Sequence, residues 1–279
     1  MTKKTAFTIK ILAVRFLTAI FIISSLSTQS QAQLNPGYKV SVKFPQVADR
    51  GAPKRTEGSG ARGGCDLGEN QSQLVKLKAI APNNNIITSL NPHPAIYVYS
   101  QIVNKPVDFQ IFELNPEKDI YTTQFSLPQN PGIVKVKLPE TLKLQANKIY
   151  GWRFIVRCEP AQRDADKFVE GWLEIKSLTA QQLERLENFP ENPKLQAQLY
   201  SDYGIWHETL EILANWQENH LLKSEWNELL ESVELKEFAN YSVNSCCQVA
   251  DSPTTPVNTN DTEIPKTDAT KNNSWGGNL

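Results

Sequence analysis

Hydrophobic and polar residues alternate along the middle of the chain, from residue 65 to about residue 177. Neighbouring side chains on a β-strand point to opposite faces, so this alternation predicts strands with one buried face. The predicted strands are residues 74–80, 95–103, 107–114, 120–127, 133–138, 149–158 and 168–175. They recur at intervals of about ten residues without intervening helices, which predicts an antiparallel β-sandwich, immunoglobulin-like or jelly-roll-like.

The clearest strand is 149–158, whose apolar side chains share one face. That face carries Tyr150, Trp152, Phe154, Val156 and Cys158. The opposite face carries Arg153 and Arg157. Such an aromatic face is typical of a buried core, and a sugar-stacking platform is the alternative.

The hydrophobic period changes from two to that of a helix after residue 178. Thr179 with Gln182 forms a capping box, and Asn192 followed by Pro193 is a cap followed by a first-turn proline. Apolar stripes continue through residues 205–214 and 222–233. Three or four short amphipathic helices should therefore form a small layer over residues 178–240, packed on the sandwich. Their Glu-rich outer faces are assigned to solvent.

Both ends of the chain differ in composition from this body. Lys3, Lys4, Lys10 and Arg15 precede an apolar stretch at 16–26, and Ser30-Gln31-Ala32 offers a small-residue cleavage site. This pattern predicts a signal peptide over residues 1–32, with an uncleaved signal anchor as the alternative. A Gly/Pro-rich lead-in follows at 33–64, and residues 248–279 form a polar tail that is expected to be disordered. We expect export to the periplasm or the extracellular space, and no transmembrane span in the mature chain.

The four cysteines fit an oxidising compartment. Cys65 and Cys158 bracket the predicted sandwich, so we expect them to pair, although four cysteines permit three pairings. The adjacent Cys246 and Cys247 cannot bond to each other without strain, and one of them is a candidate for a disulfide that joins two chains.

The stretch 49–65 contains several glycines and a basic cluster of Arg50, Lys54, Arg55 and Arg62. Residues 58–63 match a dinucleotide-binding spacing, but no strand precedes them and no helix follows. We interpret the stretch as a flexible tether to Cys65. The alternative is an electrostatic arm, which makes the four basic residues candidates for partner binding.

Charge and residue types also limit the chemistry. Loss of residues 1–32 removes four of the 29 basic residues and none of the 30 acidic ones, which leaves a net charge near −5 and argues against nucleic-acid binding. His93, His207 and His220 show neither triad nor metal-ligand spacing. Asp164, Asp166 and Glu170 do not fit a calcium loop, and Glu113 with Glu170 is only a conceivable glycosidase pair. We therefore predict no catalytic residues, metal or cofactor.

A set of motifs in a fixed order supports a family resemblance. They are Arg50-Gly51-Ala52-Pro53, Arg62-Gly63-Gly64-Cys65, Leu127-Pro128 with Pro131-Gly132-Ile133-Val134, Tyr150-x-Trp152-x-Phe154 leading to Cys158, Val169-Glu170-Gly171-Trp172 and Gly204-Ile205-Trp206. Over residues 49–240 the chain resembles the cyanobacterial secreted family called domain of unknown function 928. This resemblance implies an exported or envelope protein with no established activity, and therefore no catalytic residue to assign.

Three functions follow as expectations. The first is a non-catalytic envelope interaction module that binds a protein through its helical layer or its basic lead-in. The second is a glycan-binding module, which requires an exposed aromatic row among Tyr97, Tyr99, Tyr121 and Trp172. The third is a hydrolase, which requires a pocket that brings histidine or paired carboxylates together.

Overall fold

The computed structural model describes residues 41–54, 65, 76–159, 163–188, 191–217 and 222–244. The predicted signal peptide, the predicted tail at 248–279, Cys246 and Cys247 lie outside the described residues. So do Arg55 and Arg62 of the basic cluster and His220.

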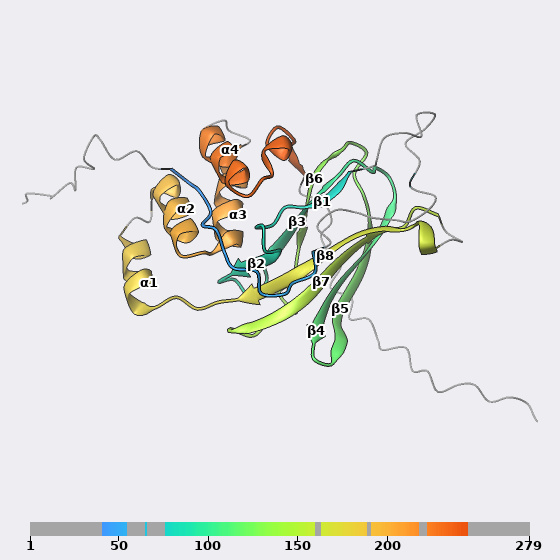
Figure 1. Ribbon diagram of the computed structural model, residues 1–279, viewed down its shortest axis with the longest axis horizontal. Helices are drawn as coiled ribbons and strands as arrows, with labels where there is room; N and C mark the ends of the chain where they lie inside the picture. Colours follow the sequence, from blue (N-terminus) through green and yellow to red (C-terminus); the bar gives the residue numbers. More distant parts are fainter. Residues whose placement is uncertain are drawn as a thin grey trace, which may run out of the picture. The chain divides into compact units, whose positions relative to one another are not determined.

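Two β-sheets form the body of the molecule (Figure 1). The four-stranded sheet has the order β1 (Leu77–Ala79), β3 (Ala95–Ser100), β6 (Gly132–Lys137) and β9 (Val243–Asn244). The five-stranded sheet has the order β2 (Ile86–Ser89), β8 (Lys167–Ile175), β7 (Lys148–Val156), β4 (Pro106–Leu114) and β5 (Glu117–Ser126). In the described part of the chain, four helices lie between β8 and β9, so the predicted α+β class with a sandwich and a C-terminal helical layer is confirmed.

Each sheet also contains one parallel pair, which differs from the purely antiparallel sandwich predicted from the strand spacing. Strand β2 runs parallel to β8, and β9 runs parallel to β6. β2 has only four residues, all buried, and β9 has two, so neither shows an alternation of polar and apolar positions. The sandwich is therefore built from two mixed sheets rather than from purely antiparallel ones.

The first two helices begin where their capping signals predict. α1 (Ala180–Glu187) has the Thr179–Gln182 capping box, and α2 (Pro193–Asp202) begins after Asn192, whose Oδ1 accepts from the Leu195 N–H. α3 (Trp206–Gln217) and α4 (Lys223–Ser232) complete the layer, and two short 3₁₀ turns lie at Arg163–Ala165 and Lys236–Phe238. The predicted helical spacing over 178–240 is confirmed.

Strand β3 lies between two layers, and every one of its residues is buried. Tyr97 contacts α3 through its hydroxyl group, and the Tyr99 ring packs on Phe238 with 4.7 Å between ring centroids. The alternate residues, including Ile96 and Val98, belong to the apolar core on the other face. The four-stranded sheet is thus covered by helices on one face and by the five-stranded sheet on the other.

The aromatic face of β7 forms the centre of the core, as its alternation predicts. Trp152 and Phe154 are fully buried, and Phe154 lies in register with Phe109 of β4 and Val169 of β8. Burial of a side chain of this size stabilises the fold by about 2–3 kcal/mol, so β7 is a major stabilising element. These two residues are therefore not available as a sugar platform.

Helix α1 differs from the packing expected of its apolar stripe. It buries none of its residues, and the Leu183 side chain remains 47% exposed. Within the described part of the chain, no helix combines the length and apolar character that crossing a bilayer requires.

Candidate binding site

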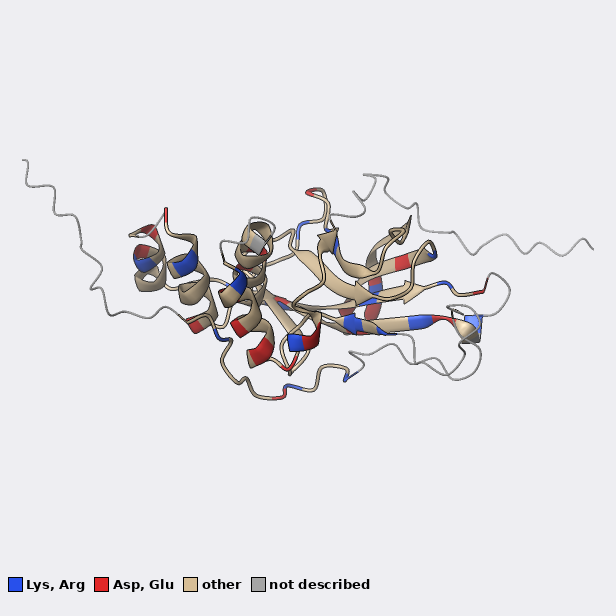
Figure 2. Cartoon of the chain, turned by 90° about the horizontal axis from the view of Figure 1, so that it is seen from above, with Lys and Arg blue, Asp and Glu red and all other residues tan. Residues whose placement is uncertain are grey.

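Residues 41–54 form an ordered segment, which we call the strap, that runs from the helices to the five-stranded sheet. Its first part is held by α2 and α4: Ser201 donates to the Lys43 carbonyl at 2.7 Å, and the Phe44 N–H donates to Ser232 Oγ at 2.9 Å. The Phe44 ring meets Trp206 edge-on, with 5.1 Å between centroids. These residues, which belong to the lead-in predicted from sequence, thus contact two of the helices and Trp206. Figure 2 shows the strap along one edge of the molecule, carrying both acidic and basic positions.

The second part of the strap is fastened by Asn85. The Asn85 side-chain amide donates to the carbonyls of Pro53, at 2.5 Å, and of Glu170, at 2.7 Å, so it joins the strap to β8. Asn85 has a φ of 55°, a left-handed conformation that asparagine tolerates better than most residues. Gly51 has a φ of 83°, which turns the strap and lets its N–H donate to Asp49 Oδ1 at 2.9 Å.

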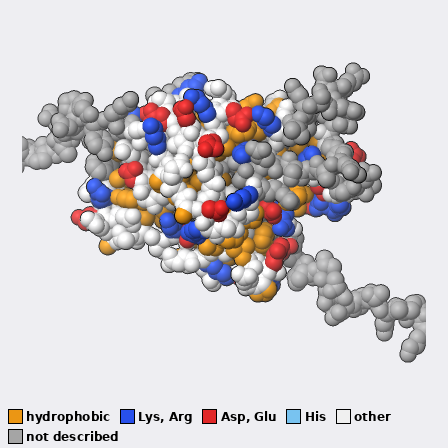
Figure 3. All heavy atoms as spheres, in the orientation of Figure 1, with side chains coloured by type: hydrophobic (Ala, Val, Ile, Leu, Met, Phe, Trp, Pro, Cys, Tyr) orange, Lys and Arg blue, Asp and Glu red, His pale blue; other side chains and the backbone are white. Residues whose placement is uncertain are grey.

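The basic residues predicted as a binding arm have local acidic partners where they are described. Arg50 forms an ion pair with Glu174 of β8 at 2.9 Å, and Lys54 pairs with Asp49 at 3.2 Å. Arg50 therefore helps to fix the strap on the sheet, whereas Lys54 and Asp49 are 84% and 56% exposed and stay accessible. On the face that the strap crosses, charges of both signs are interspersed (Figure 3).

A cleft of about 290 Å³ lies between the strap and the turn that precedes β2. It is lined by Val47, Asp49, Ala52, Lys54, Asn83, Asn84 and Asn85. The Asn84 side chain holds the cleft wall together: its amide donates to the Ala48 carbonyl, and its Oδ1 accepts from the Ile86 N–H. The walls are thus fixed by hydrogen bonds, while the ion pair of Asp49 and Lys54 and the exposed Asn83 face solvent.

Replacing Asn85 by alanine should release the strap, because two backbone carbonyls lose their donor and a left-handed residue becomes strained. We expect the free energy of unfolding to fall by about 2 kcal/mol in urea titrations. Limited proteolysis should also cut the strap faster. Asn83→Ala, an exposed change in the same turn, is the matched control and should leave both measurements unchanged. Equal effects of the two substitutions would contradict the role given to Asn85.

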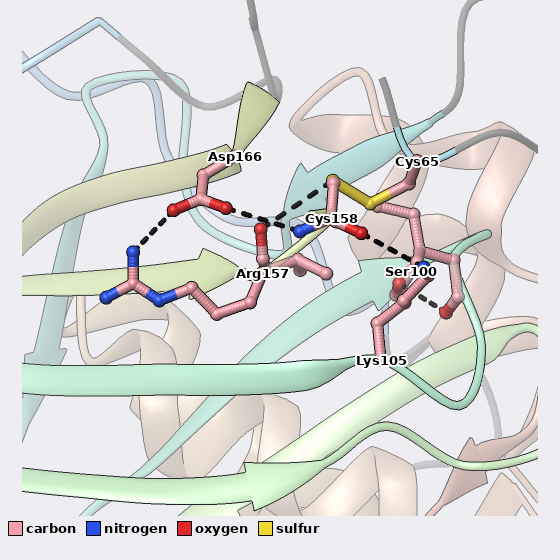
Figure 4. The surroundings of a disulfide bond; sticks show 8 residues. Cys65, Ser100, Lys105, Arg157, Cys158 and Asp166 are labelled. Carbon is pink, nitrogen blue, oxygen red and sulfur yellow. Dashed lines mark hydrogen bonds and ion pairs between the residues drawn. A yellow bond between two sulfur atoms is a disulfide. The ribbon is translucent and has the colours of Figure 1, made fainter. Parts of the chain in front are cut away.

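Cys65 and Cys158 form a disulfide at the end of β7, with 4.6 Å between their Cα atoms (Figure 4). The Cys158 N–H donates to Asp166 Oδ1 at 3.2 Å, and Lys105 Nζ donates to the Cys158 carbonyl at 3.0 Å. Arg157 forms ion pairs with both Asp166 and Asp108. Both sulfur-bearing residues are 1% exposed, so the bridge acts as a buried staple.

A partly buried polar cluster joins α3 to the four-stranded sheet. Glu211 accepts hydrogen bonds from the Tyr97 hydroxyl and from Lys135 Nζ, both at 2.5 Å. Burial tends to raise the pKa of Glu211, but the contacts with Lys135 and Tyr97 outweigh it and hold the pKa below its ordinary value. Glu211 therefore stays ionised and holds the helix on the sheet.

Glu208 fixes the loop after β2 in a similar way. Its Oε1 accepts from Ser89 Oγ and the Leu90 N–H, each at 2.9 Å, and from the Asn91 N–H at 3.1 Å. Burial tends to raise its pKa, but His207 and these hydrogen bonds lower it overall. His207 is buried, and its Nε2 accepts from the Ala95 N–H at 2.9 Å, so the histidine holds the start of β3 on α3.

Comparison of the sequence with models of known protein families gives a match. The model described as Domain of Unknown Function (DUF928) matches residues 57–243, about two thirds of the chain. The chain belongs to the DUF928 family. The matched part of this DUF928 chain contains both sheets, the disulfide and all four helices, whereas the strap precedes it. No curated protein matches the sequence.

The carboxylates conceived as a glycosidase pair are both engaged in ion pairs in this DUF928 fold. Glu113 pairs with Lys148, and Glu170 pairs with Arg153, so each carboxylate of the conceived glycosidase pair has its own basic partner. Within the described residues, His, Cys, Asp and Glu form no group suited to a metal ion.

The aromatic row required for glycan binding does not form from the four tyrosine and tryptophan candidates of the DUF928 chain. Tyr97 and Tyr99 are each 2% exposed. Tyr121 lies in register with Ile111 on the core side of the five-stranded sheet, whereas Trp172 lies opposite Gly151 on the other side. The two half-buried rings therefore point to different faces.

Proposed function

We propose that this DUF928 chain is an exported, non-catalytic interaction module of the cell envelope that binds a protein partner at the cleft beside the strap. Export is supported by the signal-like pattern of residues 1–32 and by a buried disulfide, a feature typical of oxidising compartments. The family match supports the domain assignment and carries no activity of its own.

The observation that carries the proposal is the construction of the cleft. The strap is anchored at both ends by residues distant in sequence, including Ser201, Ser232 and Asn85. Because the walls are already held in place, binding a partner costs less conformational entropy, which favours affinity. Asp49 and Lys54 add accessible charges that can be matched by a partner.

The absence of a catalytic role is supported by how the ionisable side chains are used. Glu208 accepts hydrogen bonds that hold the loop after β2, and Glu211 accepts hydrogen bonds that hold α3 on the sheet. His207 accepts from the Ala95 backbone amide. All three lie at the interface of α3 with strands rather than at the cleft. A general base must reach a bound substrate, and these groups are engaged with protein partners outside the cleft.

A fractionation and capture experiment tests the proposal. The full chain carrying a C-terminal tag is expressed in its native host, and the N-terminus of the protein from the envelope fraction is sequenced. We expect cleavage after Ala32. Cross-linked capture should then retain a protein that is lost when the envelope fraction is pretreated with protease. Retention of the protein in the cytoplasm would contradict the proposal. Capture that depends only on wall polysaccharide would also contradict it and would establish the glycan-binding alternative.

A further inference from the structure

The cleft beside the strap offers a specific charge pattern to a partner. Asp49 and Lys54 both line it, and their ion pair is exposed to water on both sides. Water and salt compete strongly with such a pair, so a ligand that supplies both an ammonium and a carboxylate group can replace it readily. Arg50 is not expected to pair with the ligand, because its ion pair with Glu174 holds it on β8.

The two charges differ in how firmly they are placed. Asp49 Oδ1 accepts from the Gly51 N–H at 2.9 Å, so the turn fixes the carboxylate, while its Oδ2 faces Lys54. Lys54 is 84% exposed, and its long side chain is free to swing toward an anion. The cleft thus presents a fixed negative group beside a mobile positive group.

The rest of the lining fits a polypeptide. Asn83 supplies an exposed amide that can both donate to and accept from a peptide group. Val47 is 36% exposed and Ala52 is buried, so they form an apolar wall for the aliphatic stem of a basic side chain. Among the described residues, the lining contains no aromatic ring for a sugar to stack on.

We infer that the cleft binds a polar peptide segment of the partner in which an acidic and a basic side chain lie close together in a defined order. The basic side chain lies against Asp49 and Val47, and the acidic side chain pairs with Lys54. This inference rests on the proposed function, since it names the chemistry of the partner at the same site.

An array of blocked hexapeptides tests the inference. The peptides carry Glu before Lys or Lys before Glu at each spacing, together with all-acidic, all-basic and uncharged sequences, and neutral oligosaccharides are spotted beside them. The purified mature protein should be retained on peptides with both charges in one order, at least tenfold above the uncharged peptides. Retention should fall as salt is raised.

The charge-swapped variant D49K/K54D provides the decisive comparison. It keeps an ion pair but exchanges the positions of the charges, so the preferred order of Glu and Lys in the peptide should invert. A purely structural defect would abolish retention without inverting it. The control E231K/K236E swaps another exposed ion pair with the same five-residue separation, outside the cleft, and should keep the original order.

The outcomes separate the inference from the proposed function. An unchanged order in D49K/K54D, or no retention on any two-charge peptide, overturns the inference even when capture from the envelope fraction succeeds. Retention on oligosaccharides alone assigns the cleft to glycans and overturns it as well. Failure of envelope capture with retained peptide binding contradicts only the proposed cellular function.

Discussion

Replacing both Cys65 and Cys158 by serine should lower the free energy of unfolding by about 2–5 kcal/mol. The bridge joins residues 93 positions apart, and closing a loop of that size restricts the unfolded chain strongly. Urea titrations of the wild type under oxidising and reducing conditions, and of the double variant, measure the effect. The reduced wild type should approach the double variant only after prolonged reduction, because the bridge is buried.

The reductant itself provides the control for this prediction. The double variant lacks the Cys65–Cys158 bridge, so reductant should change its unfolding midpoint far less than that of the wild type. A double variant as stable as the oxidised wild type would show that the packing of β7 holds the fold without the bridge.

Substitution of Glu211 by glutamine should lower the free energy of unfolding by about 2 kcal/mol at neutral pH. Lys135 would keep its charge at a site where only 16% of its side chain is exposed, and it would lose its carboxylate partner. Glu184→Gln on the exposed surface of α1 is the matched control and should change stability little.

The same carboxylate predicts how stability depends on pH. The folded-state pKa of Glu211 lies below its ordinary value of 4.5, so its contribution is present above pH 4.5 and is lost as the pH falls through the folded-state pKa. The stability difference between wild type and E211Q should therefore shrink below pH 4.5. A difference that stays constant down to the acid unfolding of both proteins would contradict the role of the ionised carboxylate.

The longer strands and the helix caps could be predicted because their signals are local. Alternation along β7 and the capping residues Thr179 and Asn192 determine structure within a few residues. Strand β2 could not be predicted in this way. Its four residues are all buried, and its parallel partner β8 lies far along the chain, so only the tertiary structure defines it.

The strap and its cleft also depend on distant contacts. Glycine and proline in residues 49–64 indicated flexibility, but the strap carbonyls meet Ser201 and Asn85, which lie 158 and 32 residues away from their partners. No local pattern encodes such pairs. Of the predicted basic candidates, Lys54 lines the cleft, whereas Arg50 pairs with Glu174 of β8.

The partly buried cluster on α3 has a sequence signal that distinguishes it from a solvent-facing helix surface. The Glu-rich faces of the helices were assigned to solvent, yet His207, Glu211 and Ala214 are spaced by four and three residues, on one helix face. Ala214 belongs to the predicted apolar stripe and is buried. Acidic residues in register with an apolar stripe indicate a partner across the interface, and Lys135 and Tyr97 fill that role here.

Site-specific photo-cross-linking tests most directly the claim that a protein partner binds at the cleft beside the strap. A photoreactive amino acid replaces Asn83, which lines the cleft, or Glu140, an exposed residue outside the cleft lining, and the cells are irradiated before fractionation. We predict that position 83 yields one dominant adduct with an envelope protein and that D49K/K54D removes it, while position 140 yields none. No adduct at position 83, or the same adduct at both positions, would contradict the claim.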